Sequence, residues 1–469
     1  MKNTHGMDMI SGPVLGKILL FALPLALTGV LQVAFNAADI IVIGRFAADG
    51  ALAAVGACSS LISLLVNFFI GVATGAKIAI SHALGARDEK NASEHVHNAM
   101  ATALIFGIFV LLLGQIASPA LLRLMATPEE VLDGAVAYMR IYFLGSPAFL
   151  VYNYGAAIIR TSGDTRRPLL YLSFSGVVNV LLNLLFILGL SWKEDLVLAA
   201  SGVAIATAVS HYISAILIVA HLLREKGILR LRIRSLRIYR DKLWRILTLG
   251  IPAGIQSSLF SISNVLIQSN INAFGAAAIA GNTAATSIEN FAHTALDAFN
   301  QSTLTFVGQN KGAGKYYRFR RIYFVSLITT VITGLVIGFG ILLSSDALLS
   351  LYISESAVES IAYAHARANL VLPLVFIGGA MSMMGGALRG YGKSLEAMVN
   401  AIIGICGMRL VWIYIIYPLI QNGDPVHDLQ ALWASYPFTW AVTAVLQCTV
   451  FWIYYAREKK KHPAFFVKE

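Results

Sequence analysis

Four polar side chains within long apolar stretches of the sequence have the chemistry of a site for a cation or a proton. Asp39 lies about seven residues before the end of an apolar run over 14–46. Asn179 and Asn183, in the run over 168–190, are four residues apart and therefore share one face of a helix. A carboxylate in hydrocarbon is costly and usually serves a function, and burial favours its protonated form.

Thr207 completes the set, about ten residues into the apolar run over 197–222. At ~1.5 Å per residue, counting from the outer end of each run places all four groups in one slab roughly 10–17 Å below the outer membrane surface. Oxygen atoms of this kind bind hard cations. The four residues therefore form a candidate H⁺ site or Na⁺ site. Buried asparagines also commonly hydrogen-bond neighbouring helices, and that alternative stays open.

The composition indicates which elements hold these side chains. The chain has 469 residues, of which 57% are hydrophobic and 13% charged, and its mean hydropathy is +0.72. A soluble domain carries about twice that charged fraction. Long apolar runs recur along the whole chain and predict an all-α polytopic membrane protein, because a lone segment in lipid satisfies its backbone groups only as a helix. Twelve runs are predicted, over 14–46, 51–82, 98–118, 131–157, 168–190, 197–222, 246–270, 277–308, 322–345, 360–386, 395–417 and 431–455.

The basic residues predict the orientation of these runs. One set of alternate loops, taken with both ends of the chain, holds 28 of the 35 Lys and Arg residues. The opposite loops hold three: Arg45, Arg123 and Lys193. Four more lie within the runs: Lys77, Arg140, Arg367 and Arg409. Because basic loops stay in the cytoplasm, both termini are expected there, which requires an even number of spans.

The two halves of the sequence resemble each other. The predicted organisation is a six-helix lobe over 1–222, a basic cytoplasmic linker over 223–245, a second six-helix lobe over 246–455, and a basic tail over 456–469. Repeats of six helices share one orientation, so a pseudo-twofold axis along the membrane normal is expected, with a substrate cavity between the lobes. The segments that recur, at offsets of 227 to 229, are Lys17–Pro24 with Arg245–Pro252, Leu84–Ala86 with Lys311–Ala313, and Arg160–Asp164 with Arg389–Lys393.

Taken in order and at their spacing, these segments resemble the multidrug and toxic compound extrusion (MATE) family over essentially the whole chain. The resemblance implies export of organic, mostly cationic and lipophilic compounds, driven by inward H⁺ or Na⁺. The residues that carry it are Pro24, Asp39, Gly44, Ser81–Asp88 and Arg160–Pro168 in the first half, and Gly250–Pro252, Val307–Gly314 and Gly386–Gly392 in the second.

The resemblance also assigns roles to the four polar residues. A first-helix Asp, two polar or acidic positions on the fifth helix and a Thr on the sixth form the coupling network of MATE proteins. Asp39, Asn179, Asn183 and Thr207 resemble these positions. Some archaeal relatives carry Asp where this chain has Asn183, so the identity of the coupling ion stays open.

The second half departs from one bacterial branch of the family, which uses carboxylates in the seventh and tenth helices. Here the runs over 246–270 and 360–386 contain none. The run over 277–308 instead carries acids at Glu289 and Asp297, four residues on either side of His293. We expect Glu289 to face the cavity and attract a cationic drug. Asp297 lies closer to the cytoplasm, and pairing with a basic group is the alternative for it. Arg409, near mid-depth of the eleventh run, is a candidate partner of either acid, and its pairing stays open.

The sequence therefore predicts a multi-pass antiporter of the cytoplasmic membrane of a prokaryote, working as a monomer among membrane lipids. Its expected partners are small organic cations, with no nucleic acid. No cofactor is expected, and without an ATP-hydrolysing domain the energy comes from H⁺ or Na⁺. A flippase for a lipid-linked precursor is the main alternative, and a basic cavity would favour it. A membrane-embedded enzyme would need a paired nucleophile and base, which the sequence does not offer, and a purely structural scaffold is the last option.

Overall fold

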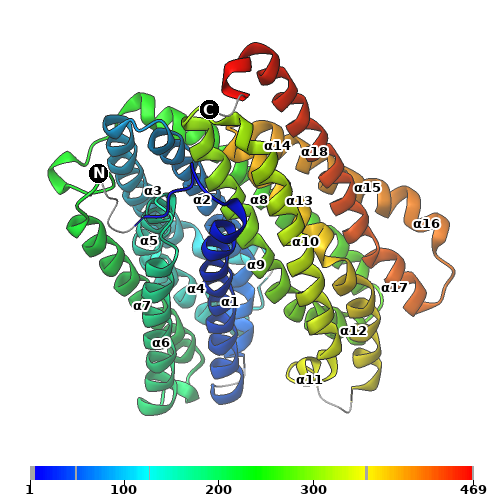
Figure 1. Ribbon diagram of the computed structural model, residues 1–469. Helices are drawn as coiled ribbons and strands as arrows, with labels where there is room; N and C mark the ends of the chain where they lie inside the picture. The colour runs from blue at the N-terminus through cyan, green and yellow to red at the C-terminus, as the bar shows by residue number, and fades with distance from the viewer. Residues whose placement is uncertain (1–5, 48–49, 126, 354–356, 467–469) are drawn as a thin grey trace. The chain divides into compact units, whose positions relative to one another are not determined.

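The computed structural model describes residues 6–47, 50–125, 127–353 and 357–466, and within these residues all regular structure is helical (Figure 1). The predicted all-α polytopic fold is therefore confirmed. The helices of the first half are α1 (Val14–Phe46), α2 (Ala51–Gly85), α3 (Glu89–Leu124), α4 (Glu129–Leu144), α5 (Ser146–Thr161), α6 (Arg166–Leu184) and α7 (Leu196–Arg224). Those of the second half are α8 (Arg240–Asn272), α9 (Ala276–Gly312), α10 (Phe319–Leu343), α11 (Ser345–Leu349), α12 (Val358–Val371), α13 (Val375–Gly390), α14 (Ser394–Ala401), α15 (Met408–Val411), α16 (Tyr417–Ile420), α17 (Pro425–Trp433) and α18 (Ser435–Lys461).

Each predicted apolar run corresponds to one of these helices or to a consecutive set of them. Among the described residues, ten helical segments are long and apolar enough to cross a membrane, and the α4–α5 pair, bent by 45°, makes an eleventh. The segment that corresponds to a predicted run but does not qualify is α9. Its amide, hydroxyl and charged side chains lower the hydropathy that lipid-facing helices require.

Two differences between the observed and the predicted helix boundaries change the limits of the predicted linker and tail. The linker is shorter than predicted, because α7 continues to Arg224 and α8 already begins at Arg240. The last helix continues to Lys461, so part of the predicted tail is helical. Residues 1–5 of the predicted first lobe and residues 467–469 of the tail lie outside the described residues.

The contacts of the chain define two compact units. Unit 1 comprises the described residues of Met1–Asp8 together with Val30–Gly254, and unit 2 comprises Met9–Gly29 together with Ile255–Glu469, as far as they are described. Each unit thus contains part of α1 and part of α8, which the predicted lobe boundaries do not anticipate. The division falls after Gly29 in α1 and after Gly254 in α8, two positions whose separation along the chain is close to the repeat offset.

In unit 1, the first part of α8 packs backbone to backbone on α2. A Cβ atom placed on Gly75 would overlap the backbone of Ile246 and Gly250, and one on Gly71 would overlap the backbone of Gly254. Glycines allow helices in lipid to approach this closely. The linker packs on α3, where the backbone N–H of Arg232 donates to His97 Nε2 at 3.0 Å.

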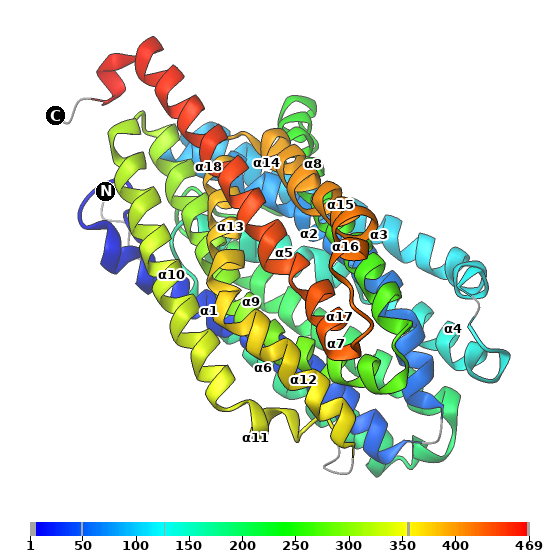
Figure 2. The same ribbon diagram turned by 90° about the vertical axis from the view of Figure 1, so that its right-hand side faces the viewer.

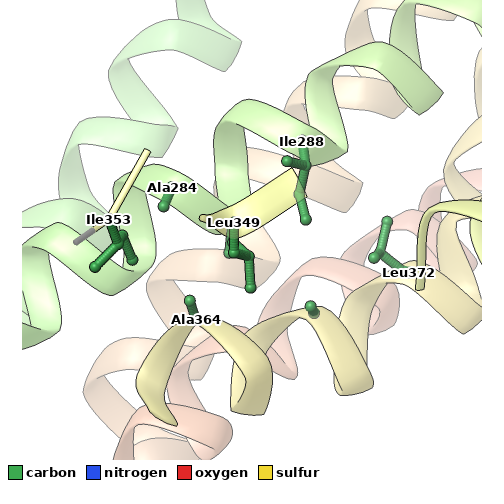
Figure 3. Packing of buried hydrophobic residues seen from close by; sticks show 8 residues of the cluster. Ala284, Ile288, Leu349, Ile353, Ala364 and Leu372 are labelled. Carbon is green, nitrogen blue, oxygen red and sulfur yellow. The ribbon is translucent and has the colours of Figure 1, made fainter. Parts of the chain in front are cut away.

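In unit 2, an apolar cluster joins α9, α11 and α12. Its members are buried side chains that include Ile288 on α9, Leu349 on α11 and Ala364 on α12 (Figure 3). Helix α9 also contacts α13, and Figure 2 shows α12 and α13 following one another along it. This packing directs the residue after Ile288, Glu289, into the protein rather than toward lipid.

Candidate functional site

Asp39 lies in the part of α1 that belongs to unit 1, against the polar face of α6. The amide Nδ2 of Asn183 donates a hydrogen bond to Asp39 Oδ1, at 2.5 Å. Asp39 is half-buried, whereas Asn179 and Asn183 are buried at 4% and 0% exposure. The predicted i, i+4 face of α6 is therefore the face that meets the carboxylate.

Asn179 links Asp39 to α7. In the amide orientation that satisfies its neighbours, its nitrogen donates to Asp39 Oδ1 at 2.7 Å and its oxygen accepts from the backbone N–H of Thr207 at 3.3 Å. The Thr207 hydroxyl donates to the carbonyl of Val203 at 2.9 Å, which leaves its oxygen lone pairs available. The structure thus brings all four predicted residues together; we call them the Asp39 site.

Two local features of the sequence position this site. Gly176 lies on α6 one turn before Asn179, and a Cβ at that position would overlap the ring of Phe35, one turn before Asp39 on α1. The missing side chain lets α1 approach α6. Two residues after Asn183 the helix becomes a π-helical segment, Leu185–Gly189, a distortion that frequently marks functional sites.

Two tyrosines of α4 adjoin the site and were not predicted from the sequence. Tyr138 and Tyr142 both interact electrostatically with Asp39. The Tyr142 ring also meets the ring of His211 on α7, with centroids 6.2 Å apart. Tyrosine is common enough in membrane helices that no sequence signal separates these two from the others.

No basic side chain among the described residues balances the negative charge of an ionised Asp39. Among the described residues no Lys, Arg or His forms a salt bridge with Asp39. The buried Oδ1 of Asn183 has no hydrogen-bond donor in the described part of the chain. A carboxylate, an amide oxygen without a donor and a hydroxyl oxygen fit a monovalent hard cation, and the carboxylate alone fits a proton.

The acids of the second half have different surroundings, and one predicted pairing is wrong. Glu289 binds Arg367 of α12, not Arg409, through two hydrogen bonds of 2.8 and 2.7 Å. Arg367 also donates to Asn282 Oδ1 at 2.6 Å, and the Trp433 indole donates to the same oxygen at 3.0 Å. Glu289 is therefore a paired, 2%-exposed carboxylate, which weakens its predicted role in attracting a cationic drug.

Asp297 and His293 lie elsewhere on α9. Asp297 accepts hydrogen bonds from Asn300 at 2.7 Å and Gln301 at 3.4 Å, and it interacts electrostatically with Arg389 rather than with Arg409. The His293 ring packs edge-on against Trp440, with centroids 5.1 Å apart. His293 also interacts electrostatically with Glu289 and Arg367, whereas Asp297 has a separate set of neighbours.

Arg409 is buried on the short helix α15. Its Nη1 donates to Ser263 Oγ at 3.1 Å and to Asn264 Oδ1 at 2.6 Å, both on α8. Its guanidinium carbon lies 4.6 Å from the centroid of the Tyr436 ring on α18, and that of Arg367 lies 4.9 Å from the same centroid. We call Arg409, Ser263, Asn264 and Tyr436 the Arg409 site.

Arg367, the partner of Glu289, was not predicted to take part in this cluster. It is one of four basic residues within the apolar runs, and a charge at that depth needs a partner.

Comparison with known proteins gives a consistent result. The sequence model of the MatE family matches residues 24–185 and 252–415, which is more than half of the chain. A probable multidrug resistance protein of Bacillus subtilis, YoeA, is 27% identical over 91% of both chains. The probable multidrug resistance protein NorM of Thermotoga maritima is 25% identical over 87% of this chain and 86% of its own. A protein named FAD transporter, from Shewanella oneidensis, is 25% identical over 94% of both.

Solved structures share the fold. A crystal structure of MATE in complex with MaL6 covers 98% of this chain and 100% of its own, with a TM-score of 0.90 and 21% identity. The outward-facing conformation of a multidrug resistance MATE family transporter has the same coverage and identity, with a TM-score of 0.89. At this identity the likeness establishes the arrangement of helices and no more.

Proposed function

The chain belongs to the MatE family of multidrug and toxic compound extrusion transporters, and from that premise we propose that it is a secondary antiporter. It exports small organic compounds in exchange for inward H⁺ or Na⁺ bound at the Asp39 site. Members of the family are transporters rather than enzymes and need no cofactor.

One observation carries the proposal: the Asp39 carboxylate is held by Asn183 and is balanced by no basic group among the described residues. A structural acid in lipid is normally paired, because an isolated charge there is expensive. An acid that exchanges an ion instead has to be free to lose its negative charge when the ion arrives. The amides of Asn179 and Asn183 offer donors to the ionised carboxylate and oxygens to a cation.

Ion binding drives the transport cycle through its different affinity for two conformations. External H⁺ or Na⁺ neutralises Asp39, the contacts to α6 rearrange, the affinity for cargo falls, and the cargo leaves. Pro24 gives α1 a means to respond, because it has no backbone N–H and weakens the helix one turn before Thr28. The Thr28 hydroxyl donates to the Pro24 carbonyl at 2.7 Å.

The distribution of basic residues in the loops supports a location and an orientation for the protein. We assign the protein to the cytoplasmic membrane of a prokaryote, with both termini in the cytoplasm and a single chain as the working unit. The asymmetry of 28 basic residues against three in the opposite loops supports this orientation.

The charge of the cargo is a separate question. Cationic, lipophilic cargo stays a prediction of the sequence, and of the two acids named for it Glu289 is neutralised by Arg367. The relatives carry names as different as multidrug resistance protein and FAD transporter. A flippase for a lipid-linked precursor remains the second candidate, favoured by the buried positive charge of Arg409, which has no salt-bridge partner among the described residues of unit 2.

Reconstitution into liposomes tests the antiport. The protein is reconstituted into the membrane of liposomes that contain ethidium. A proton gradient is imposed in one experiment and a sodium gradient in another, and dye efflux is measured in each. We expect efflux with one of the two gradients, and its loss in Asp39→Asn. Asp133→Asn is the matched control, because Asp133 is an exposed acid of α4 in the same unit.

Equal amounts of each variant in the membrane are a condition of the comparison. Normal ion-driven efflux by Asp39→Asn would remove Asp39 from the mechanism. Loss of efflux in Asp133→Asn as well would show a general sensitivity of unit 1 to lost charge rather than a role for the Asp39 site.

A further inference from the structure

Arg409 is a buried charge without a counter-ion in the described part of the chain. It is 3% exposed, and among the described residues no carboxylate forms a salt bridge with it. Its hydrogen-bond partners Ser263 and Asn264 are neutral, and its buried Nε–H has no acceptor among those same residues. A buried guanidinium in this state is costly, and such a cost is normally offset by a function.

The neighbouring charges do not balance Arg409. Arg367 is close enough to Arg409 to interact electrostatically with it, and both pack against the ring of Tyr436. The acid of this cluster, Glu289, uses both carboxylate oxygens on Arg367. Two guanidinium groups and one carboxylate leave an excess of one positive charge.

The internal repeat places this excess at the counterpart of the Asp39 site. Tyr436 follows Thr207 by one repeat offset, and Arg367 follows Tyr138 by the same offset. On the remaining two helices the match is to the neighbouring turn: Asn264 lies three residues before the position equivalent to Asp39, and Arg409 lies three residues before the position equivalent to Asn183. Helices at four equivalent places thus form an acidic site in unit 1 and a basic site in unit 2.

A π-helical segment lies close to both the Asp39 site and the Arg409 site. A π-helical segment, Trp412–Ile416, follows Arg409 and begins one repeat offset after the segment that follows Asn183. A second π-helical segment, Ile402–Gly407, precedes Arg409. Such segments occur frequently at functional sites, because each inserts an extra residue and re-aims the side chains beyond it.

We propose that the Arg409 site binds an oxyanion, the carboxylate or phosphate group of an organic cargo. The planar guanidinium offers several N–H donors in a geometry that matches both groups. Asn264 is exposed, so Arg409 lies one side chain below an accessible surface. The ring of Tyr436 supports the guanidinium and offers an apolar face beside it for the rest of the cargo.

This inference rests on the proposed export function and adds to its cargo compounds with an acidic group, including zwitterions, which the Arg409 site would hold. It also assigns different tasks to the two units: the negative site of unit 1 takes the driving cation, and the positive site of unit 2 takes the cargo. Binding at Arg409 can be measured without any gradient, so the two proposals can fail independently.

The test uses the purified full chain in phosphatidylcholine nanodiscs. Thermal stability and equilibrium binding are measured with phenyl phosphate, benzoate, benzyl alcohol and benzyltrimethylammonium, which share one aromatic ring and differ in charge. The variants are Arg409→Gln, Arg409→Lys and the control Asp133→Asn. A second set of nanodiscs contains phosphatidylglycerol, so that a lipid phosphate competes with the soluble probes.

We expect the two anions to bind and raise the melting temperature, and the alcohol and the cation not to. Arg409→Gln should weaken anion binding at least tenfold without lowering the melting temperature of the ligand-free protein, because it removes an unbalanced charge. Arg409→Lys should bind at an intermediate level, and Asp133→Asn, which lies outside both sites, should bind the anions normally. If phosphatidylglycerol competes with the soluble anions, the oxyanion that the site binds comes from a lipid headgroup. If phosphatidylglycerol does not compete, the oxyanion belongs to a soluble cargo.

Three results would overturn the proposal. They are preferential binding of benzyltrimethylammonium, anion binding that Arg409→Gln leaves unchanged, and a ligand-free Arg409→Gln protein that loses stability while no anion binds to the wild type. The last result would mean that Arg409 only joins α15 to α8. Ethidium efflux that depends on Asp39 would still support the antiport in each case.

Discussion

Arg367 binds Glu289 through both carboxylate oxygens, at 2.8 and 2.7 Å, in the interior of unit 2. Both side chains are 3% exposed, so the pair is shielded from water and from lipid. A buried pair of this kind contributes little relative to an apolar pair of the same size, but removing one partner leaves the other as an unbalanced buried charge. The pairing therefore determines how unit 2 responds to single substitutions.

We predict that Arg367→Gln destabilises the protein strongly. Glu289 would lose its cationic partner, and the Asn282 side-chain oxygen would lose the donor that Arg367 provides. Breaking a buried pair in this way costs roughly 3–5 kcal/mol, and thermal unfolding in detergent measures the loss. The double variant Arg367→Gln/Glu289→Gln, which removes both charges, should be more stable than the single one. A double variant that is less stable than the single would contradict the pairing argument.

Close packing of α1 on α6 is the next feature to test. Gly176→Ala places a Cβ where the Phe35 ring lies, so α1 must move or the ring must turn. Overpacking of this kind costs about 1–3 kcal/mol. We expect reduced ion-driven dye efflux in liposomes, because Asp39 lies one turn from Phe35. Phe35→Ala added to Gly176→Ala should restore part of the efflux, and an unchanged defect in the double variant would count against the contact.

Two glycines of α2 should behave in opposite ways. At Gly75 a Cβ would overlap backbone atoms of Ile246 and Gly250, which cannot turn aside, so Gly75→Ala should abolish stable expression. At Gly56 no described atom lies within 4 Å of the added Cβ. Gly56→Ala should therefore leave the protein folded and add up to about 1 kcal/mol of helix stability. Fluorescence-detected size-exclusion chromatography of both variants distinguishes them, and equal profiles would refute the close approach of α8 to α2.

Asp88 makes stability depend on pH at the start of α3, outside the membrane-spanning segments. The backbone N–H of Asn91 donates to Asp88 Oδ1 at 3.0 Å, and this bond is the main cause of a pKa below the ordinary value of 3.8. Because the pKa is lower in the folded state, the cap stabilises above the unfolded pKa and is lost as the pH falls through the folded value. Asp88→Asn keeps a capping oxygen but does not titrate.

The measurement is the melting temperature between pH 7 and pH 3. Wild type should lose more stability across this range than Asp88→Asn, and the difference between the two should arise below about pH 4, where an unfolded aspartate begins to bind protons. Parallel curves for the two proteins would show that the cap does not contribute.

The sequence by itself determined the helices, the repeat and the Asp39 site. Long apolar runs leave the backbone no alternative to helix in lipid, and basic residues sort by loop. Asp39, Asn179, Asn183 and Thr207 could be grouped because depth along a helix is proportional to residue number, and because a spacing of four places Asn179 and Asn183 on one face.

Only the tertiary structure decided the partners of the remaining charges. Arg367, not Arg409, binds Glu289, and Arg409 faces the neutral side chains of Ser263 and Asn264. These pairings depend on the rotation of each helix about its own axis. Helices that are apolar on all sides encode that rotation weakly, because lipid provides no contrast between an inner and an outer face. Close glycine contacts and π-helical segments determine the rotation of each helix instead. These contacts and segments can be seen only in the packed structure.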